Sequence, residues 1–402
     1  MTIKKNRLAL LLVVLICHAC GKQQDQLPQR DLFWFLYEGT RALEKMEYAR
    51  VMALVDSAAR LDARNANVEF LRARVLSELG RYKEAEQAYT KVKELNPAYR
   101  GVWNNLGNNA YYQTKYRDAI LFYQRELAEN DTSFLAWRGL GRAYSESGIP
   151  DSAVYAFDHA IRANPGFGGS YYSKALVYEK EGELEKALAL AQKATTLVPA
   201  NLEYKFAYAA LLVKTGRFEA AIPHLTAVIE QWPWHHSALY NLGQAYVRTG
   251  RTEEGKQLLD RAEKARSLQA KVGLQEQTIM AFGDDPMAYA ALGSSLRRAG
   301  RYDDAIKAYK IALHLAPASF AIENNLANLY LIKQDTTNAI FHYRAILERD
   351  PTLVDVWLNL GTVEAILGHT EAAREAWRNA LRHDPNNAQA RAYLARLRRE
   401  GK

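Results

Sequence analysis

Apolar residues recur along this chain with the spacing of α-helices, from residue 32 almost to the end. Leu326, Leu329 and Tyr330 follow the i, i+3, i+4 pattern that places side chains on one face of a helix. Small residues, glycines and prolines interrupt the pattern regularly, and comparison of the chain with itself gives a period of 34 residues. This period predicts pairs of helices stacked into an all-α solenoid.

Two positions of the repeat hold small residues, because only a small side chain there lets the two helices of one repeat approach closely. The eighth position is occupied by Ala73, Gly107, Gly141, Ala175, Ala209, Gly243, Gly293, Ala327 and Gly361. The twentieth position is occupied by Ala85, Ala119, Ala153, Ala187, Ala221, Gly255, Ala305, Ala339 and Ala373.

Glycine and proline mark the helix ends of most repeats. Glycine adopts the left-handed conformation that ends a helix, and proline cannot continue one. The turn between the two helices carries Gly80, Gly148, Gly182, Gly216, Gly250, Gly300 and Gly368. The second helix is expected to stop at Pro97, Pro165, Pro199, Pro233, Pro317, Pro351 and Pro385.

The block that begins at Phe134 illustrates the repeat. It reads Ala136-Trp137-Arg138-Gly139-Leu140-Gly141, then Ala143-Tyr144, followed by Gly148, Ala153, Phe157, Ala160 and Pro165. This block resembles the tetratricopeptide repeat (TPR), with its W-x2-L-G-x2-Y signature and later Ala, Phe, Ala and Pro. The resemblance covers about nine-tenths of the chain and places repeat starts at residues 32, 66, 100, 134, 168, 202, 236, 286, 320 and 354.

The resemblance implies a right-handed TPR solenoid of helix-turn-helix repeats that binds other proteins. Repeats 1–7 would occupy residues 32–269 and repeats 8–10 residues 286–387. Residues 388–402 would form a C-terminal capping helix with Ala392, Leu394, Ala395 and Leu397 on its apolar side. The aromatic residues of the first repeat, Phe33, Trp34, Phe35 and Tyr37, would cap the open end of the core or contact a partner.

One insertion interrupts the period. Between repeats seven and eight the period lengthens to 50, which leaves 16 extra residues near 270–285. Residues 262–283 are rich in helix-forming residues, so we expect them to extend the second helix of repeat seven and to turn at Gly283-Asp284-Asp285. The insertion is either a tolerated loop or a hinge or docking segment between the two groups of repeats.

The first thirty residues read as an export signal. Lys4, Lys5 and Arg7 precede the apolar stretch 8–16, which is too short to span a bilayer, so residues 1–19 are predicted to be a signal peptide. Ala19-Cys20 resembles a bacterial lipobox, which implies lipidation at Cys20 with residues 20–31 as a tether. Cleavage after Ala19 by an ordinary signal peptidase is the alternative. We therefore expect an exported protein, either an outer-membrane lipoprotein facing the periplasm or surface, or a soluble periplasmic or secreted protein.

Charge and composition narrow the classes of function. The chain of 402 residues is 49% hydrophobic and 24% charged, which is typical of a folded protein outside the multi-span membrane class. Its net charge of +8 would fall to +5 without the leader, and no nucleic-acid-binding motif accompanies this mild excess, so no nucleic acid is expected as a partner. The two cysteines lie at positions 17 and 20, so the processed chain could form no internal disulfide.

No catalytic constellation is evident, and neither a metal nor another cofactor is expected. The histidines are scattered, and His235-His236, the only adjacent pair, would make a poor metal site without further carboxylate or cysteine ligands. Phosphate-binding loops and the nucleophile motif Gly-x-Ser-x-Gly are missing from the sequence. The sequence therefore predicts a non-catalytic protein.

The first helices of TPR proteins line a concave groove, and polar residues fall at its expected positions. Asparagine can bond a peptide backbone as donor and acceptor, and arginine can hold a carboxylate in a bidentate way. The predicted groove residues are Arg74, Asn104, Asn105, Asn108, Arg138, Arg142, Asn241, Gln244, Asn324, Asn325, Asn328 and Asn359. They resemble the asparagine ladder of peptide-binding TPR proteins, although the lysines of the chaperone-type carboxylate clamp are missing.

Two roles of these polar residues remain open from the sequence. One role is ligand binding in the groove. In the other, the asparagine side chains bond a neighbouring repeat and the arginines pair with acids such as Glu78 and Glu146. The leading hypothesis is an envelope scaffold or adaptor that holds a protein or an extended acidic or C-terminal peptide. The alternative is a soluble periplasmic chaperone or carrier of extended polypeptides, and an enzyme would need a partner to complete an active site.

Overall fold

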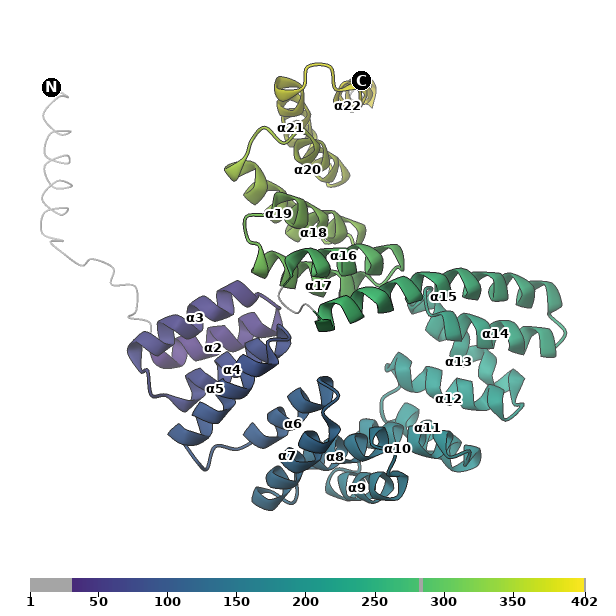
Figure 1. Cartoon of the computed structure of the whole chain (residues 1–402). Helices are drawn as coiled ribbons and strands as arrows, with labels where there is room; N and C mark the ends of the chain where they lie inside the picture. Colours follow the sequence, from purple (N-terminus) through teal and green to yellow (C-terminus); the bar gives the residue numbers. More distant parts are fainter. Residues whose placement is uncertain (1–30, 282–284, 401–402) are drawn as a thin grey trace, which may run out of the picture.

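The computed structural model describes residues 31–281 and 285–400, and every regular element in this part of the chain is a helix. The helices form ten antiparallel pairs followed by a single helix (Figure 1). Their bounds are α2 Leu32–Glu44, α3 Tyr48–Leu61, α4 Ala66–Glu78, α5 Tyr82–Leu95, α6 Val102–Tyr112, α7 Tyr116–Glu129, α8 Phe134–Glu146, α9 Pro150–Ala163, α10 Gly168–Lys180, α11 Leu184–Leu197, α12 Leu202–Lys214, α13 Phe218–Gln231, α14 His236–Arg248, α15 Thr252–Ala281, α16 Pro286–Arg298, α17 Tyr302–Leu315, α18 Phe320–Ile332, α19 Thr336–Arg349, α20 Val354–Ile366, α21 Thr370–His383 and α22 Ala388–Glu400. The predicted all-α fold is confirmed.

The two helices of a pair pack closely where one of them carries a small residue. A Cβ atom added to Gly141 in α8 would lie 2.7 Å from the ring of Phe157 in α9, and one added to Gly361 in α20 would lie 2.3 Å from Trp377 in α21. Both aromatic side chains are almost fully buried. The small residue at the eighth position therefore makes room for the aromatic residue at the twenty-fourth.

The turn inside each pair requires one residue in the left-handed conformation. Gly148 (φ 75°) and the other turn glycines adopt it without strain. The pairs without a turn glycine adopt it too, at Met46 (φ 57°), Thr114 (φ 60°) and Gln334 (φ 62°). Because side chains with a Cβ atom disfavour this region, packing of the two helices imposes it there.

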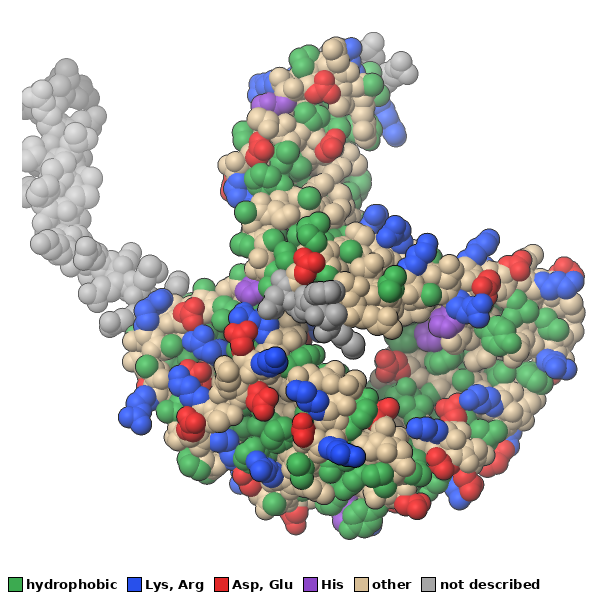
Figure 2. All heavy atoms as spheres, in the orientation of Figure 1, with side chains coloured by type: hydrophobic (Ala, Val, Ile, Leu, Met, Phe, Trp, Pro, Cys, Tyr) green, Lys and Arg blue, Asp and Glu red, His purple; other side chains and the backbone are tan. Residues whose placement is uncertain are grey.

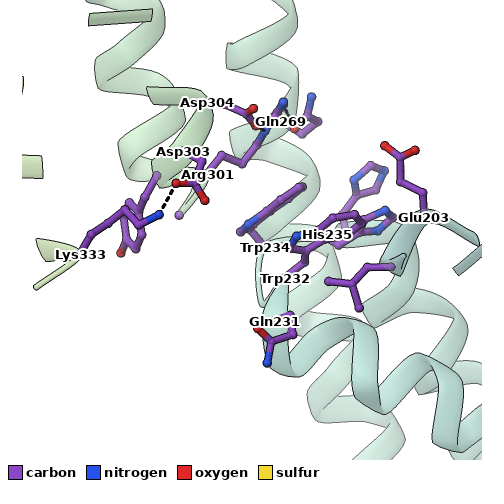
Figure 3. A pocket seen from close by; sticks show the side chains of 14 residues that line it. Glu203, Gln231, Trp232, Trp234, His235, Gln269, Arg301, Asp303, Asp304 and Lys333 are labelled. Atoms are coloured by element: carbon purple, nitrogen blue, oxygen red, sulfur yellow. Dashed lines mark hydrogen bonds and ion pairs between the residues drawn. The ribbon is translucent and has the colours of Figure 1, made fainter. Parts of the chain in front are cut away.

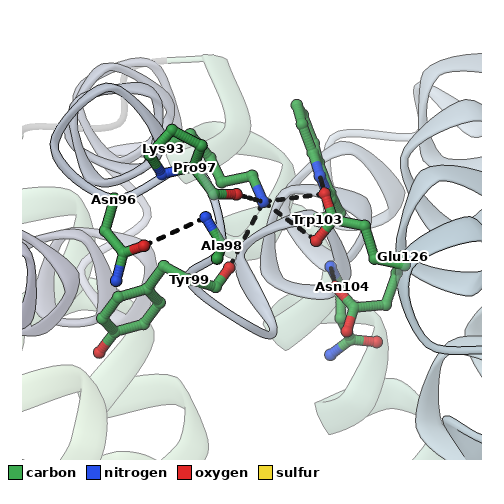
Figure 4. Close-up of polar contacts among 9 residues, drawn as sticks. Lys93, Asn96, Pro97, Ala98, Tyr99, Trp103, Asn104 and Glu126 are labelled. Carbon is green, nitrogen blue, oxygen red and sulfur yellow. Dashed lines mark hydrogen bonds and ion pairs between the residues drawn. The ribbon is translucent and has the colours of Figure 1, made fainter.

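The third pair begins two residues later than the sequence predicted. Gly101 precedes α6 with φ 80° and offers no side chain to cap the helix, and the Glu126 carboxylate in α7 instead accepts from the backbone N–H of Asn104 at 3.2 Å (Figure 4). Beside it, the Lys93 ammonium donates to the carbonyl of Pro97 at 2.6 Å and to Glu129 at 2.9 Å. The contact between Lys93 and Glu129 fastens the second repeat to the third.

The first helices of the pairs lie on the concave side of the solenoid. Consecutive first helices pack against each other at α2–α4, α6–α8, α8–α10, α10–α12, α12–α14 and α18–α20, and consecutive second helices do not pack to a similar extent. Elements on the inner side of a curved stack are closer together than those on the outer side. The groove predicted from the sequence therefore lies along the first helices.

The solenoid curves until its eighth repeat meets its first two, so that repeats one to eight form a closed ring (Figure 1). Helix α17 packs against α3, and the Lys310 ammonium donates to the carbonyl of Lys45 at 2.6 Å. The Tyr289 hydroxyl donates to the carbonyl of Leu79 at 3.5 Å. One buried cluster joins the core of the first two repeats to that of the last three. Repeats of a solenoid usually contact only their neighbours, so these contacts between distant repeats are a departure from the simple repeat array.

The described part of the insertion, up to Ala281, is helical, and the turn predicted at Gly283-Asp284 lies outside the described residues. Helix α15 continues for 30 residues, more than twice the length of the other helices, and Val272 in its extension is fully buried in the cluster that closes the ring. Figure 2 shows the ring around an opening, with repeats nine and ten projecting from it. On the face shown there, basic and acidic side chains are interspersed.

Both ends of the described chain are covered in part. Trp34 and Phe35 pack against the core, whereas Phe33 and Tyr37 are exposed and stack on each other with ring centres 6.5 Å apart. At the other end, Leu394 and Leu397 of α22 pack against the last repeat. The predicted apolar side of α22 is wrong in two places, because Ala392 and Ala395 are exposed and Ala390 and Tyr393 take the packing positions.

Candidate functional site

Arg138 and Arg142 form the centre of the candidate site on the concave face. They lie one turn apart on α8, and no acidic residue of the described chain forms an ion pair with either. Their positive charges are therefore available to stabilise an anion placed nearby. The Arg138 guanidinium lies over the ring of Phe167 at 5.3 Å, and that of Arg142 lies over Tyr111 at 4.2 Å. Aromatic faces thus hold both arginines in place without neutralising them.

The next repeat leaves room for Arg138. A Cβ atom added to Gly169, in the first turn of α10, would lie 3.2 Å from the Arg138 Nη1 atom. Burial and the proximity of Arg142 lower the pKa of Arg138, although an arginine remains charged at neutral pH. Two like charges held together in a partly buried place favour the binding of an anion.

Tyrosines surround the two arginines. Burial raises the pKa of Tyr123, and the positive charges of Arg142 and Arg138 oppose that rise. The Tyr123 side chain therefore lies near both arginines. Tyr172 and Tyr204 approach from α10 and α12 with ring centres 4.9 Å apart. The pattern of asparagine and arginine at groove positions did not mark these tyrosines as site residues, although Tyr172 stands at the position of repeat five that Arg138 holds in repeat four.

Two polar atoms in this region are buried without a hydrogen-bond partner. They are the Oδ1 atom of Asn104 and the Nε atom of Arg138, which occupy the same position of repeats three and four. A buried polar group without a partner is costly, and a ligand that supplied a donor to Asn104 and an acceptor to Arg138 would remove that cost.

Other predicted ladder residues are bonded within their own repeats. The Asn108 side-chain oxygen accepts from the Tyr123 hydroxyl at 2.7 Å, and the Asn328 oxygen accepts from the Tyr343 hydroxyl at 2.5 Å. In both repeats the tyrosine lies fifteen residues after the asparagine. An asparagine at the ninth position therefore supports the packing of a tyrosine from the second helix.

The ladder residues of repeats nine and ten bond to each other. Asn359 donates to the side-chain oxygen of Asn328 at 3.1 Å and to that of Asn324 at 3.5 Å. These contacts fasten the two repeats to each other. Bonding to a neighbouring repeat is the alternative role that the sequence left open for the asparagines. They leave fewer polar groups for a ligand in this part of the groove.

The remaining predicted residues are not brought into one site. Asn105 donates to the carbonyl of Gly101 at 2.8 Å, and Gln244 donates to the Tyr240 hydroxyl at 2.7 Å. Asn241 and Asn325 are half-buried on α14 and α18. The structure thus brings Arg138 and Arg142 together on α8, whereas Asn241 and Gln244 lie on α14 and Asn325 lies on α18.

Arg74 stands apart from the arginine pair. It lies near Tyr89 and Tyr99, and the described residues give it no hydrogen bond or ion pair. Glu78, the acid considered as its partner, pairs instead with Lys307 of the eighth repeat at 3.1 Å. Within the described chain, Glu146 forms no ion pair with Arg142.

Models of the tetratricopeptide repeat match residues 70–99, 104–166, 146–201, 212–273, 290–353 and 354–397, which together cover most of the chain. The chain belongs to the tetratricopeptide repeat family. TPR proteins generally mediate protein–protein interactions, so the coarse functional class predicted from the sequence is confirmed.

Several individual TPR proteins are distantly similar to this chain. The BBSome complex member BBS4 of Bos taurus is 21% identical over 353 residues, which cover 87% of this chain and 62% of the relative. Among solved structures, the TPR protein YrrB is 27% identical with a TM-score of 0.39 and covers 45% of this chain and 94% of its own. PilF of Pseudomonas aeruginosa is 17% identical with a TM-score of 0.45 and covers 50% and 92%.

Metal-binding groups and membrane-spanning helices are absent from the described part of this TPR chain. Within residues 31–281 and 285–400, no group of three or more His, Cys, Asp or Glu side chains could hold a metal ion. None of the described helices combines the length and the hydropathy needed to cross a bilayer. Cys20 and the predicted signal peptide lie outside the described residues.

Proposed function

We propose that this TPR protein is a non-catalytic scaffold or adaptor of the bacterial cell envelope, which holds a protein through an extended acidic or C-terminal segment. The segment binds to the concave face of repeats three to five, with a carboxylate between Arg138 and Arg142. The observation that carries this proposal is the pair of unneutralised arginines next to the unsatisfied Asn104 oxygen and Arg138 nitrogen.

The site suits an extended segment better than a compact ligand. The two guanidinium groups can hold one carboxylate through charge-assisted hydrogen bonds, while the Asn104 oxygen accepts from a backbone N–H of the same segment. The tyrosines of repeats three, five and six supply flat surfaces along the groove. A relative named as a member of a complex also agrees with a scaffold role.

The envelope location rests on the sequence. The basic residues and the apolar stretch 8–16 support export, and Ala19-Cys20 supports lipidation. Metabolic labelling with palmitate is expected to mark the wild-type protein and to spare Cys20→Ala. Absence of label from the wild type, together with recovery of the protein in the soluble periplasmic fraction, would favour the alternative of a soluble carrier.

Capture of partners from solubilised envelopes tests the arginine pair. We expect Arg138→Ala/Arg142→Ala to lose a partner that the wild type retains, because removing a charged contact costs about 2 kcal/mol or more. The matched control is Arg374→Ala/Arg378→Ala, which removes two arginines with the same spacing from the second helix of repeat ten. Equal capture by all three proteins would refute the assignment of the site.

Affinity for a peptide derived from the captured partner completes the test. Calorimetry measures the affinity for this peptide and for two neutralised versions of it. One version carries a C-terminal amide, and the other has its acidic side chains replaced by the corresponding amides. The wild type is expected to prefer the carboxylate forms, and Arg138→Ala/Arg142→Ala to show no preference. A wild-type affinity that is independent of the carboxylates would place the binding energy elsewhere.

A further inference from the structure

A cavity of about 750 Å³ lies between repeats six and seven on one side and repeats eight and nine on the other (Figure 3). One wall consists of the segment that joins α13 to α14, with Trp232, Trp234 and His235. The opposite wall consists of Arg301 in the turn between α16 and α17, Asp303 in the first turn of α17, and Lys333 at the end of α18. The groove residues discussed above do not line this cavity.

The extended helix α15 creates the cavity. It leads from repeat seven to repeat eight, and Gln269 in its extension accepts from Arg301 at 3.3 Å. In a regular array the turn of repeat eight would continue the stack directly after repeat seven. The extra turns of α15 instead place that turn opposite the aromatic wall.

The aromatic wall presents nearly parallel rings. The ring centres of Trp232, Trp234 and His235 lie 5.7 to 5.9 Å from one another, with interplanar angles of 8° to 28°. All three side chains are only half-buried. The guanidinium of Arg301 already lies over the Trp234 ring at 5.3 Å, so the wall can hold a planar cation.

The charges around the wall favour a cation. Arg301 pairs with Asp304 at 2.7 Å and Lys333 pairs with Asp303, so these four charges are neutralised in pairs. Glu203, from the first turn of α12, is exposed and has no ion pair with the described residues. The lining therefore carries one uncompensated negative charge.

His235 adds no positive charge to the wall at neutral pH. Its Nδ1 atom accepts from the backbone N–H of Ala238 at 3.1 Å, which requires that nitrogen to be unprotonated. Burial is the main cause that lowers its pKa, with smaller contributions from His236 and Arg301. The ring therefore stays neutral and stacks like the indoles beside it.

We propose that this cavity binds an arginine side chain of a protein segment held by the scaffold, with the guanidinium stacked on the Trp232–Trp234–His235 wall and paired with Glu203. Arginine suits the site better than lysine because its planar, weakly hydrated head group stacks on aromatic rings. The inference rests on the proposed function only in naming a protein segment as the source of the cation.

Spectroscopy of the indole groups tests the cavity independently of any partner. The probe is N-acetyl-arginine methylamide, and the neutral control is the corresponding citrulline compound, which has the same shape without the charge. Indole N–H resonances of the whole protein are assigned with Trp232→Phe and Trp234→Phe. We expect the arginine probe to shift both resonances in a saturable way and the citrulline compound to leave them in place.

Glu203→Gln separates the charge from the aromatic wall. This substitution is expected to weaken the affinity for the arginine probe about threefold to tenfold. The control Glu219→Gln, which removes an exposed acid from neighbouring α13, is expected to leave that affinity unchanged. Equal shifts with both probes, no shift with either, or an unchanged affinity in Glu203→Gln would overturn the inference. Arg138→Ala/Arg142→Ala should bind the probe normally, so failure of the carboxylate site would be recognised separately.

Discussion

Closure of the ring depends on two tyrosines, and replacing both is expected to open it. Tyr48 in α3 and Tyr289 in α16 are 2% and 6% exposed. Tyr302 occupies in repeat eight the position that Tyr48 occupies in repeat one, and it is 38% exposed. The additional burial of Tyr48 therefore comes from α17, which packs against α3 only because the solenoid closes.

The magnitude follows from this difference in burial. About one third of a tyrosine side chain corresponds to roughly 70 Å² of surface, which contributes about 2 kcal/mol at 25 cal/mol per Å². A similar contribution is expected from Tyr289, and the exposed pair of Lys307 with Glu78 adds at most about 1 kcal/mol. Two buried polar atoms without partners, the Tyr48 hydroxyl and His314 Nδ1, oppose closure.

Small-angle scattering of the purified protein measures the opening. Tyr48→Ser/Tyr289→Ser is expected to increase the radius of gyration while circular dichroism shows an unchanged helix content, since each repeat retains its own core. The control Tyr116→Ser/Tyr171→Ser changes the same positions of repeats three and five, where both tyrosines are half-buried. Its scattering curve should match that of the wild type.

If the closure variant and the wild type gave the same scattering curve, with both folded, then burial of these tyrosines would not hold the ring together. The closing energy would have to come from the apolar contacts of α15 instead.

Three further predictions concern individual repeats and pH. Gly141→Leu should lower the free energy of unfolding by about 1–3 kcal/mol in a urea titration, because Phe157 fills the space beside it, and unchanged stability would contradict the packing. Gln334→Gly should raise that free energy by about 1 kcal/mol, because the residue has φ 62°, and a loss of stability would show that its side chain matters more. Burial lowers the pKa of His314 from 6.5, so the unfolded chain binds its proton first as the pH falls, and stability is lost below about pH 6.5. His314→Leu should therefore lose less stability than the wild type between about pH 7.5 and 5.5, and equal losses in thermal scans would assign the effect to other groups.

The candidate site was only partly predictable. Arg138 and Arg142 stand at groove positions of one repeat, so the sequence alone placed them on one face of one helix. Their freedom from acid partners depends on which side chains the curved stack brings near them. The same limit applies to Asn108 and Asn359, which the pattern assigned to the groove and which the structure shows bonded to Tyr123 and to neighbouring asparagines.

The cavity lined by Trp232 and Trp234 shows the limit most clearly. Nothing in the sequence relates these residues to Arg301, because the period that aligns one repeat with the next carries no information about distant repeats. The residues meet because helix α15 is longer than the others and because curvature accumulates over the array. A lengthened period was visible in the sequence, but its geometrical effect was not.

The sequence by itself determined the helix pairs of this protein, since each pair depends on residues within one period: the small eighth and twentieth positions, the turn residue and the final proline. These interactions are local and repeat along the chain, so a one-dimensional pattern records them. Only the tertiary structure decided that the ring closes, that α15 opens a cavity and that two arginines remain unpaired. These features depend on small rotations between successive repeats, which add up over the whole array and bring together residues more than two hundred positions apart.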